Sequence, residues 1–193
     1  KIISRLKNDK IDVKKLLNNS RCIDVGCGSG RYSLALKNLG CKTVNGIDYG
    51  ENGLKIAEEI KKYSGIEDVT FQKGNVLDLP YESDTFNFVF CNGVLHHTED
   101  LEKGVSELIR VARPNTWIFI YLYGDGGIFW YARKKMNEMM KLIPQEYTHI
   151  FLYKLMNMPN NRMIFSDNWY VPIETHTSNN QVIDLFDQYK VKE

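Results

Sequence analysis

The chain lacks the cysteine spacing of a metal or redox site. Its four cysteines include no C-x-x-C pair, and they stand at positions 22, 27, 41 and 91. All four fall on or beside expected strands, where a free thiol behaves as a small apolar side chain. The sequence therefore predicts buried structural thiols, no bound metal and no disulfides, which suits a reducing compartment.

Long apolar runs and an excess of one charge are also missing. No uninterrupted apolar stretch approaches the ~18 residues of a membrane span, and residues 1–20 show no apolar core of a secretory signal. We therefore expect no membrane span and a cytoplasmic location. A net charge of +1 gives no field that would favour nucleic acid as a partner. The 193 residues, 43% hydrophobic and 25% charged, suffice for one globular domain.

Residues 22–30, reading CIDVGCGSG, hold the most informative motif. The first four residues suit a strand that is covered on both faces, and three glycines follow at alternate positions. Glycine permits backbone angles that other residues avoid and lets a ligand approach the main chain closely. From Arg31 the apolar spacing becomes helical, with Gly40 as an expected C-terminal cap. The stretch predicts a strand, a glycine turn and a helix.

The glycine spacing separates several nucleotide-binding motifs. The dinucleotide fingerprint is G-x-G-x-x-G, whereas this chain has G-x-G-x-G, and no lysine follows in the P-loop position. With Asp24 inside the preceding strand, the motif resembles motif I of the class I S-adenosylmethionine-dependent methyltransferases. The resemblance implies that the turn passes beside the amino-acid end of that cofactor. It assigns cofactor contacts to Asp24, Gly26, Cys27, Gly28 and Gly30. A tight turn without a ligand remains the alternative.

The second strand is expected at residues 42–47 and ends in Asp48. This carboxylate follows Gly30 by 18 residues, close to the interval at which an acidic residue meets a ribose diol. A carboxylate can accept hydrogen bonds from both hydroxyls. By resemblance, Asp48 holds the ribose and Tyr49 lies against the adenine. A surface-turn aspartate is the alternative interpretation.

Residues 69–73 alternate as a third strand and lead into Asn75 and Val76. In the family, an acidic residue that contacts the adenine amino group usually stands where this chain has Asn75. An amide oxygen can accept the same hydrogen bond, so we assign Asn75 and Val76 to the cofactor site.

A fourth strand is expected at residues 85–91, and the sequence NGVLHH follows at 92–97. This segment resembles the small-molecule, UbiE-like (type 11) branch of the family. The tetrapeptide [Asp/Asn]-Pro-Pro-Tyr of enzymes that methylate nucleic-acid bases or glutamine is absent, so bases are not expected as acceptors. By resemblance, Cys91, Asn92 and His96 lie at the cofactor. His97 is the candidate catalytic base, because imidazole titrates near neutral pH. Packing and loop shaping are the alternative roles for both histidines.

The remaining pattern predicts the architecture. Residues 98–100 cap a helix that ends before Pro114, and a fifth strand covers residues 115–123, with Asn115 and Thr116 in place of the family's glycine pair. Strands that alternate with helices imply a doubly wound, mostly parallel sheet in a three-layer α/β/α fold, with ligands at the carboxyl ends of the strands. This is the Rossmann-like fold of class I methyltransferases.

After residue 123 the composition changes, and all six methionines lie between Met136 and Met163. Amphipathic helices are expected at residues 128–143 and 146–156, as a cap inserted after the fifth strand. Such caps commonly form acceptor pockets, and methionines with aromatics suit an apolar substrate, although simple packing explains them equally well. A looser resemblance to methyltransferases of surface-polysaccharide gene neighbourhoods makes Asp167, Tyr170 and His176 candidates for acceptor contacts. Ser178 and Gln181 have the spacing of a capping box for a last helix.

The sequence thus indicates a class I methyltransferase that uses S-adenosylmethionine and acts on a small molecule, such as a sugar or a polysaccharide or lipid precursor. The expected division is an N-terminal helical segment (1–20), a cofactor-binding core (21–123), a cap (124–177) and a last helix that leads into a sixth strand (178–193). The family's sixth and seventh strands are incomplete, so the chain is expected to be a fragment. A non-catalytic binding protein, an aminopropyl transferase and a NAD-dependent oxidoreductase remain alternatives.

Overall fold

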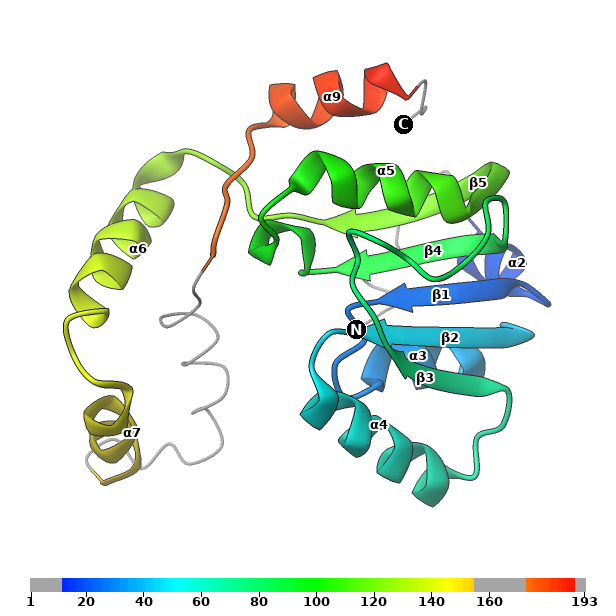
Figure 1. The fold of residues 1–193 in the computed structure, drawn as a ribbon, viewed down its shortest axis with the longest axis horizontal. Helices are drawn as coiled ribbons and strands as arrows, with labels where there is room; N and C mark the ends of the chain where they lie inside the picture. Colours follow the sequence, from blue (N-terminus) through cyan, green and yellow to red (C-terminus); the bar gives the residue numbers. More distant parts are fainter. Residues whose placement is uncertain (1–11, 155–172, 190–193) are drawn as a thin grey trace.

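The protein, described here by a computed structural model over residues 12–154 and 173–189, is built on a sheet of five parallel strands (Figure 1). The strands are β1 (Arg21–Val25), β2 (Thr43–Asp48), β3 (Val69–Lys73), β4 (Phe86–Asn92) and β5 (Ala112–Tyr121). Their order is β3-β2-β1-β4-β5, and every neighbouring pair is parallel. The order reverses between β1 and β4, which is where ligands bind in sheets of this kind. The predicted doubly wound fold is confirmed.

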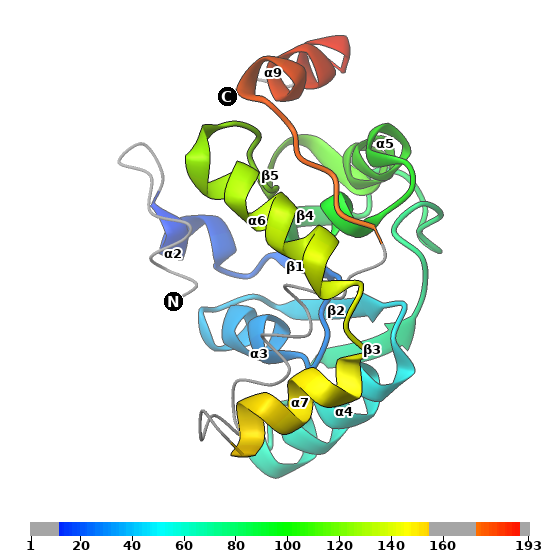
Figure 2. The ribbon, with the colours of Figure 1, turned by 90° about the vertical axis from the view of Figure 1, so that its left-hand side faces the viewer.

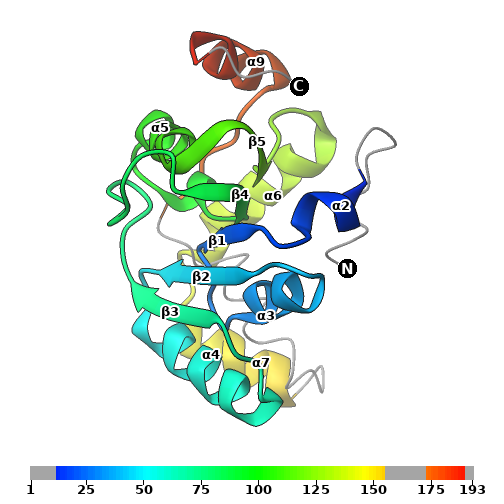
Figure 3. The same ribbon diagram turned by 90° about the vertical axis from the view of Figure 1, so that its right-hand side faces the viewer.

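Helices cover both faces of the sheet, as Figure 3 shows. Helices α2 (Val13–Leu17) and α3 (Arg31–Asn38) lie on one face, and α5 (Leu101–Val111) lies on the other. Helix α4 (Glu51–Ser64) packs along β3 and β2 at one edge. Each face has its own apolar core: Leu17, Leu36, Val44 and Phe88 are buried on the α3 side, whereas the α5 side buries Ile23, Val89, Val105 and Leu108. The two cores fix the strand ends that carry the site.

Strand β5 contains an irregularity that explains a departure from the family pattern. Ala112 pairs with Phe86 and Trp117 pairs with Phe88, so residues 113–116 form a bulge. Within it, Asn115 has φ +59°. Asparagine is one of the few residues that tolerate this left-handed conformation, which explains why it can stand where relatives carry glycine. The strand begins three residues earlier than predicted and ends at Tyr121.

The cap lies beyond the carboxyl ends of the strands (Figure 1). Helices α6 (Gly127–Met140) and α7 (Gln145–Lys154) form it, and in Figure 2 α6 crosses in front of the strand ends. Both helices lie where the sequence predicted them. Helix α6 ends three residues before the predicted end, and the last two residues of the second predicted helix, 155 and 156, lie outside the described part of the chain. The final helix, α9 (Asn179–Gln188), starts with the predicted capping box between Ser178 and Gln181.

The prediction of buried structural thiols can be compared with the structure. The four cysteines are free and buried, as expected of structural thiols. No cluster of metal-ligating side chains occurs in residues 12–154 and 173–189. No helix within the same ranges has the length and apolarity to cross a bilayer. Asp167, Tyr170 and the start of the expected sixth strand lie outside the described residues.

Candidate active site

The glycine turn after β1 is tied to the end of β2 by backbone and side-chain hydrogen bonds. The amides of Gly26 and Cys27 both donate to the carbonyl oxygen of Ile47, at 2.7 and 3.1 Å. The two oxygens of Asp48 accept from the amides of Gly28 and Gly50, each at 2.7 Å. A carboxylate has about four acceptor positions, so Asp48 retains capacity for two further donors. These hydrogen bonds join Asp48 at the end of β2 to the glycine turn after β1.

Asp24 lies in the strand before this turn and is 2% exposed. Its Oδ2 accepts a hydrogen bond of 2.6 Å from the Ser33 hydroxyl. Burial raises the pKa of Asp24 to about 7, and the nearby Asp48 carboxylate adds to the rise, whereas the Ser33 hydrogen bond opposes it. The side chain thereby joins β1 to α3, on either side of the turn.

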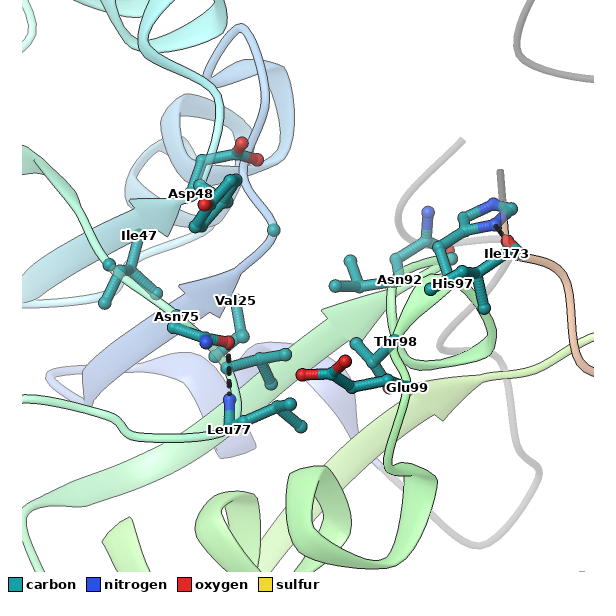
Figure 4. Close-up of a pocket in the computed structure, with 16 residues that line it drawn as sticks. Val25, Ile47, Asp48, Asn75, Leu77, Asn92, His97, Thr98, Glu99 and Ile173 are labelled. Carbon is teal, nitrogen blue, oxygen red and sulfur yellow. Dashed lines mark hydrogen bonds between the residues drawn. The ribbon is translucent and has the colours of Figure 1, made fainter. Parts of the chain in front are cut away.

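A cavity of about 590 Å³ opens at the carboxyl ends of β1, β2 and β4 (Figure 4). Asp48 and Asn75 stand on one side, and Asn92 and His97 stand on the other. Seven of the residues proposed from the sequence line the cavity: Gly26, Asp48, Tyr49, Asn75, Val76, Asn92 and His97. The topology thus brings together side chains from four separate segments of the chain.

Six other candidates do not contribute to the cavity lining. Gly28 and Gly30 belong to the turn beside it, and Cys27 is a buried residue of the same turn. Asp24 lies in the preceding strand, and Cys91 and His96 are fully buried. None of the six is among the lining residues. Burial raises the pKa of the Cys27 and Cys91 thiols, which keeps both neutral. Cys91 and His96 therefore shape the site from behind its wall.

Asn75 has a structural partner inside the chain. Its Oδ1 accepts a hydrogen bond of 2.9 Å from the amide of Leu77, and the side chain is exposed at the cavity. The oxygen has two lone pairs, so one acceptor position and both amide hydrogens remain. Asn75 can hold its loop and still meet a ligand.

Nine lining residues were not proposed as site residues from the sequence, and three of them extend the site beyond its predicted segments. Thr98 and Glu99 extend from the loop before α5 toward the cavity (Figure 4), although their spacing suggested helix capping only. Asp100 is the residue that caps the helix, through the amide of Lys103. Ile173 lies 76 residues beyond His97 in the chain, and no sequence pattern predicted its position at the cavity.

The two histidines after β4 hold this distant segment, which we call the strap (residues 173–177). Nδ1 of His97 donates to the carbonyl oxygen of Ile173 at 2.9 Å, so in the neutral ring Nε2 carries the lone pair. The amide and hydroxyl of Thr175 both donate to the carbonyl oxygen of His96, at 2.8 and 3.0 Å. The amide of Thr177 bonds the carbonyl oxygen of Tyr123 at 3.0 Å. The strap therefore closes over the ends of β4 and β5.

His96 is unusual because its ring is buried and neither ring nitrogen has a hydrogen-bond partner among the described residues. The ring stacks on Tyr123 with centroids 3.7 Å apart. Burial lowers its pKa to about 3, with contributions from His97, His176 and Arg133. With this pKa the ring is neutral near pH 7, and it packs on Tyr123.

A second cavity of about 780 Å³ lies between α6 and the other side of the strap. Trp130, Lys134 and Asn137 line one wall, and Glu174 and His176 line the other. Glu174 is fixed by Arg133 at 3.1 Å and by Nε2 of His176 at 2.9 Å. The expected methionine lining is not found among the described residues, since Met136 and Met139 face solvent. The cavity is polar and aromatic.

Comparison with known proteins agrees with this geometry. A family model described as a methyltransferase domain matches residues 16–166. The chain is 34% identical over 106 residues to a demethylmenaquinone methyltransferase of Bacillus cytotoxicus, covering 54% of this chain and 44% of that one. It is 33% identical over 118 residues to a ubiquinone biosynthesis O-methyltransferase of Paracidovorax citrulli, covering 61% and 49%. The chain thus spans about half the length of these relatives.

Among solved structures, the fold is shared with a protein of Thermotoga maritima described as a SAM-dependent methyltransferase, possible histamine N-methyltransferase. The TM-score is 0.62 at 18% identity, over 94% of this chain and 68% of that one. Members of the family with this fold use S-adenosylmethionine as methyl donor. The match over residues 16–166, on the sheet and glycine turn described above, shows that the chain belongs to the methyltransferase domain family of the class I, UbiE-like type.

Proposed function

We propose that the protein is an enzyme that transfers a methyl group from S-adenosylmethionine to an oxygen or nitrogen of a small molecule. The observation that carries the proposal is the Asp48 carboxylate, fixed by two amides at a cavity that Gly26 of the glycine turn also lines. Its orientation is set before any ligand arrives, so binding does not have to order it.

The residues at the cavity fit the adenosyl cofactor. A volume of about 590 Å³ lies within the range of small-molecule sites. A Cβ built on Gly28 would meet nothing within 4 Å, so space is open beside this turn. Asp48 has acceptor capacity for hydroxyls, and Asn75 can accept from an amine. When bound, the cofactor supplies a methyl group on an electrophilic sulfonium. The chain's own task is to bind it and to orient an acceptor against it.

The proposal also includes finer assignments. His97 is proposed as a base for a hydroxyl acceptor, because its Nε2 is free of the strap hydrogen bond. We place the protein in the cytoplasm and treat residues 21–123 as the cofactor-binding core and residues 124–177 as the acceptor region. The proposed acceptor is a hydroxyl-bearing sugar or lipid precursor, because the second cavity combines an indole with lysine, amide and carboxylate groups. A quinone precursor is the second candidate, since the two relatives described above are named a demethylmenaquinone methyltransferase and a ubiquinone biosynthesis O-methyltransferase.

The test is calorimetric titration with S-adenosylmethionine, S-adenosylhomocysteine and NAD. We expect micromolar binding of both adenosyl ligands and none of NAD. Asp48→Ala should weaken adenosyl binding at least about 100-fold, because it removes the ribose acceptor and frees two amides. Asp187→Ala, at an exposed carboxylate on α9, is the matched control and should bind as the unchanged protein does.

Two outcomes would redirect the proposal. Preference for NAD would favour an oxidoreductase on the same fold. Adenosyl binding without methyl transfer to any sugar, lipid or quinone precursor in the presence of labelled donor would favour a binding or regulatory protein. Thermal melts of Asp48→Ala separate a lost ligand contact from a lost fold.

A further inference from the structure

Helix α6 turns its polar face toward the protein and its apolar face toward solvent, which is the reverse of a usual surface helix. Its inner face holds Arg133, which pairs with Glu174 at 3.1 Å and lies over the Tyr123 ring at 4.9 Å. Trp130 and Asn137 belong to the same face and line the second cavity. No described residue of α6 is fully buried. The helix is thus attached to the protein by polar and aromatic contacts.

The outer face of α6 and of the turn after it carries a row of exposed apolar side chains. Ile128, Tyr131, Met139 and Leu142 recur at helical spacing around Lys135, and we call these five residues the outer stripe. Ile128 is 87% exposed and Leu142 is 84% exposed, so neither packs against the described protein. Contiguous exposed apolar surface of this kind marks an interaction site, because water would otherwise have to solvate it.

We propose that the outer stripe docks α6 on an anionic lipid surface. Apart from Arg133 on the inner face, residues 127–154 carry four lysines against two acidic side chains, although the whole chain has a net charge of only +1. Lys135 stands within the stripe and pairs with Glu138 at 2.8 Å, both side chains being exposed. Its aliphatic stem can lie along the apolar face while the ammonium exchanges this weak surface ion pair for phosphate groups. Tyr131 suits the boundary between headgroups and acyl chains. Such a helix lies in the plane of the membrane and does not cross it.

A second copy of the chain fits the stripe less well. In a two-fold dimer the stripe would meet itself, which would bring Lys135 of one copy against the same residue of the other. Lysines 134 and 141, exposed beside the stripe, would add further like charge. An anionic bilayer surface instead attracts these groups.

The experiment is co-sedimentation of the full chain with phosphatidylglycerol-containing vesicles and with pure phosphatidylcholine vesicles. We expect at least a tenfold preference for the anionic vesicles, decreasing as salt is raised. Ile128→Asp combined with Leu142→Asp should lower binding at least tenfold. Tyr63→Asp is the matched control, since Tyr63 is 91% exposed on α4, outside the stripe, and should not change binding.

Three results would overturn the proposal. One is the absence of sedimentation with anionic vesicles at low salt. Another is equal binding by the double variant and the control variant. The third is a concentration-dependent dimer that the double variant abolishes, because a second copy would then cover the stripe. None of these measurements needs the cofactor or methyl transfer, so they test the surface independently of the proposed enzyme activity.

Discussion

Gly26 packs against Val94 with no room for a side chain between them: a Cβ built on Gly26 would overlap Cγ2 of Val94. The glycine also has φ +73°, in the left-handed region. Gly26 follows β1 and Val94 follows β4, so the two residues join the adjacent strand ends that flank the cavity. Both line the cavity, and the tight contact fixes its floor.

Gly26→Ala is therefore expected to destabilise the fold by about 3 kcal/mol, of which roughly 1–2 kcal/mol reflects the left-handed backbone and the remainder the overlap. Gly65→Ala is the matched control, because Gly65 has φ +63° but nothing within 4 Å of a built Cβ. It should lose the backbone contribution only. Urea unfolding measures both variants, and Val94→Ala in the Gly26→Ala background should recover part of the difference. Equal losses in the two glycine variants would contradict the steric argument.

The loop that carries Asn75 and Leu77 depends on α5. Glu107 is buried and accepts from the amide of Leu79 at 2.7 Å and from Nε of Arg110 at 2.7 Å. Arg110 in turn donates to the carbonyl oxygen of Leu79 at 2.9 Å. Glu107→Ala should therefore cost about 3 kcal/mol and weaken adenosyl binding, since a buried amide and a guanidinium lose their partner. Glu102→Ala, at an exposed acid of the same helix, should cost less than about 1 kcal/mol and leave binding unchanged.

Local pattern was enough to predict the strands, the glycine turn and the capping box at Ser178, because each depends on residues close in sequence. The strap was not predictable. Its anchors on His96 and Tyr123 are backbone carbonyl oxygens, which any residue type would supply, and they lie about 50 to 80 residues away. The reversed α6 was missed for a related reason. Helical periodicity shows that one face is apolar, but it cannot show whether that face points inward.

Two substitutions at His97 separate strap anchoring from proton transfer. An asparagine amide can replace the Nδ1 donor that bonds the carbonyl oxygen of Ile173, whereas a glutamine amide approximates the position of Nε2. If His97 is a base, His97→Asn and His97→Gln should both lower kcat by roughly 10²–10⁴-fold with little change in cofactor affinity. Near-normal kcat in His97→Asn, with a loss in His97→Gln, would leave only the anchoring role.

Asp24 makes stability depend on pH. Its pKa is about 7 in the folded protein, against an ordinary value of 3.8. Between these values the folded state keeps a proton that the unfolded chain has lost, so stability falls as pH rises and then levels off above pH 7. From pH 4.5 to 7.5 the loss is about 3 kcal/mol at about 1.4 kcal/mol per pH unit. Asp24→Asn, which can still accept from Ser33, should remove this dependence in urea unfolding measured across that range.

His96 produces the opposite dependence. Below pH 6.5, its ordinary pKa, the unfolded chain binds a proton that the folded ring accepts only near pH 3, so stability rises with pH over this interval. From pH 4.5 to 7.5 the gain is again about 3 kcal/mol, so it nearly cancels the Asp24 loss. His96→Phe keeps a ring on Tyr123 and removes the unpaired nitrogens. This variant should therefore become less stable as pH rises, Asp24→Asn should become more stable, and the double variant should resemble the unchanged protein in being nearly flat. A single variant with a flat profile would show that its intact partner titrates at an ordinary pKa.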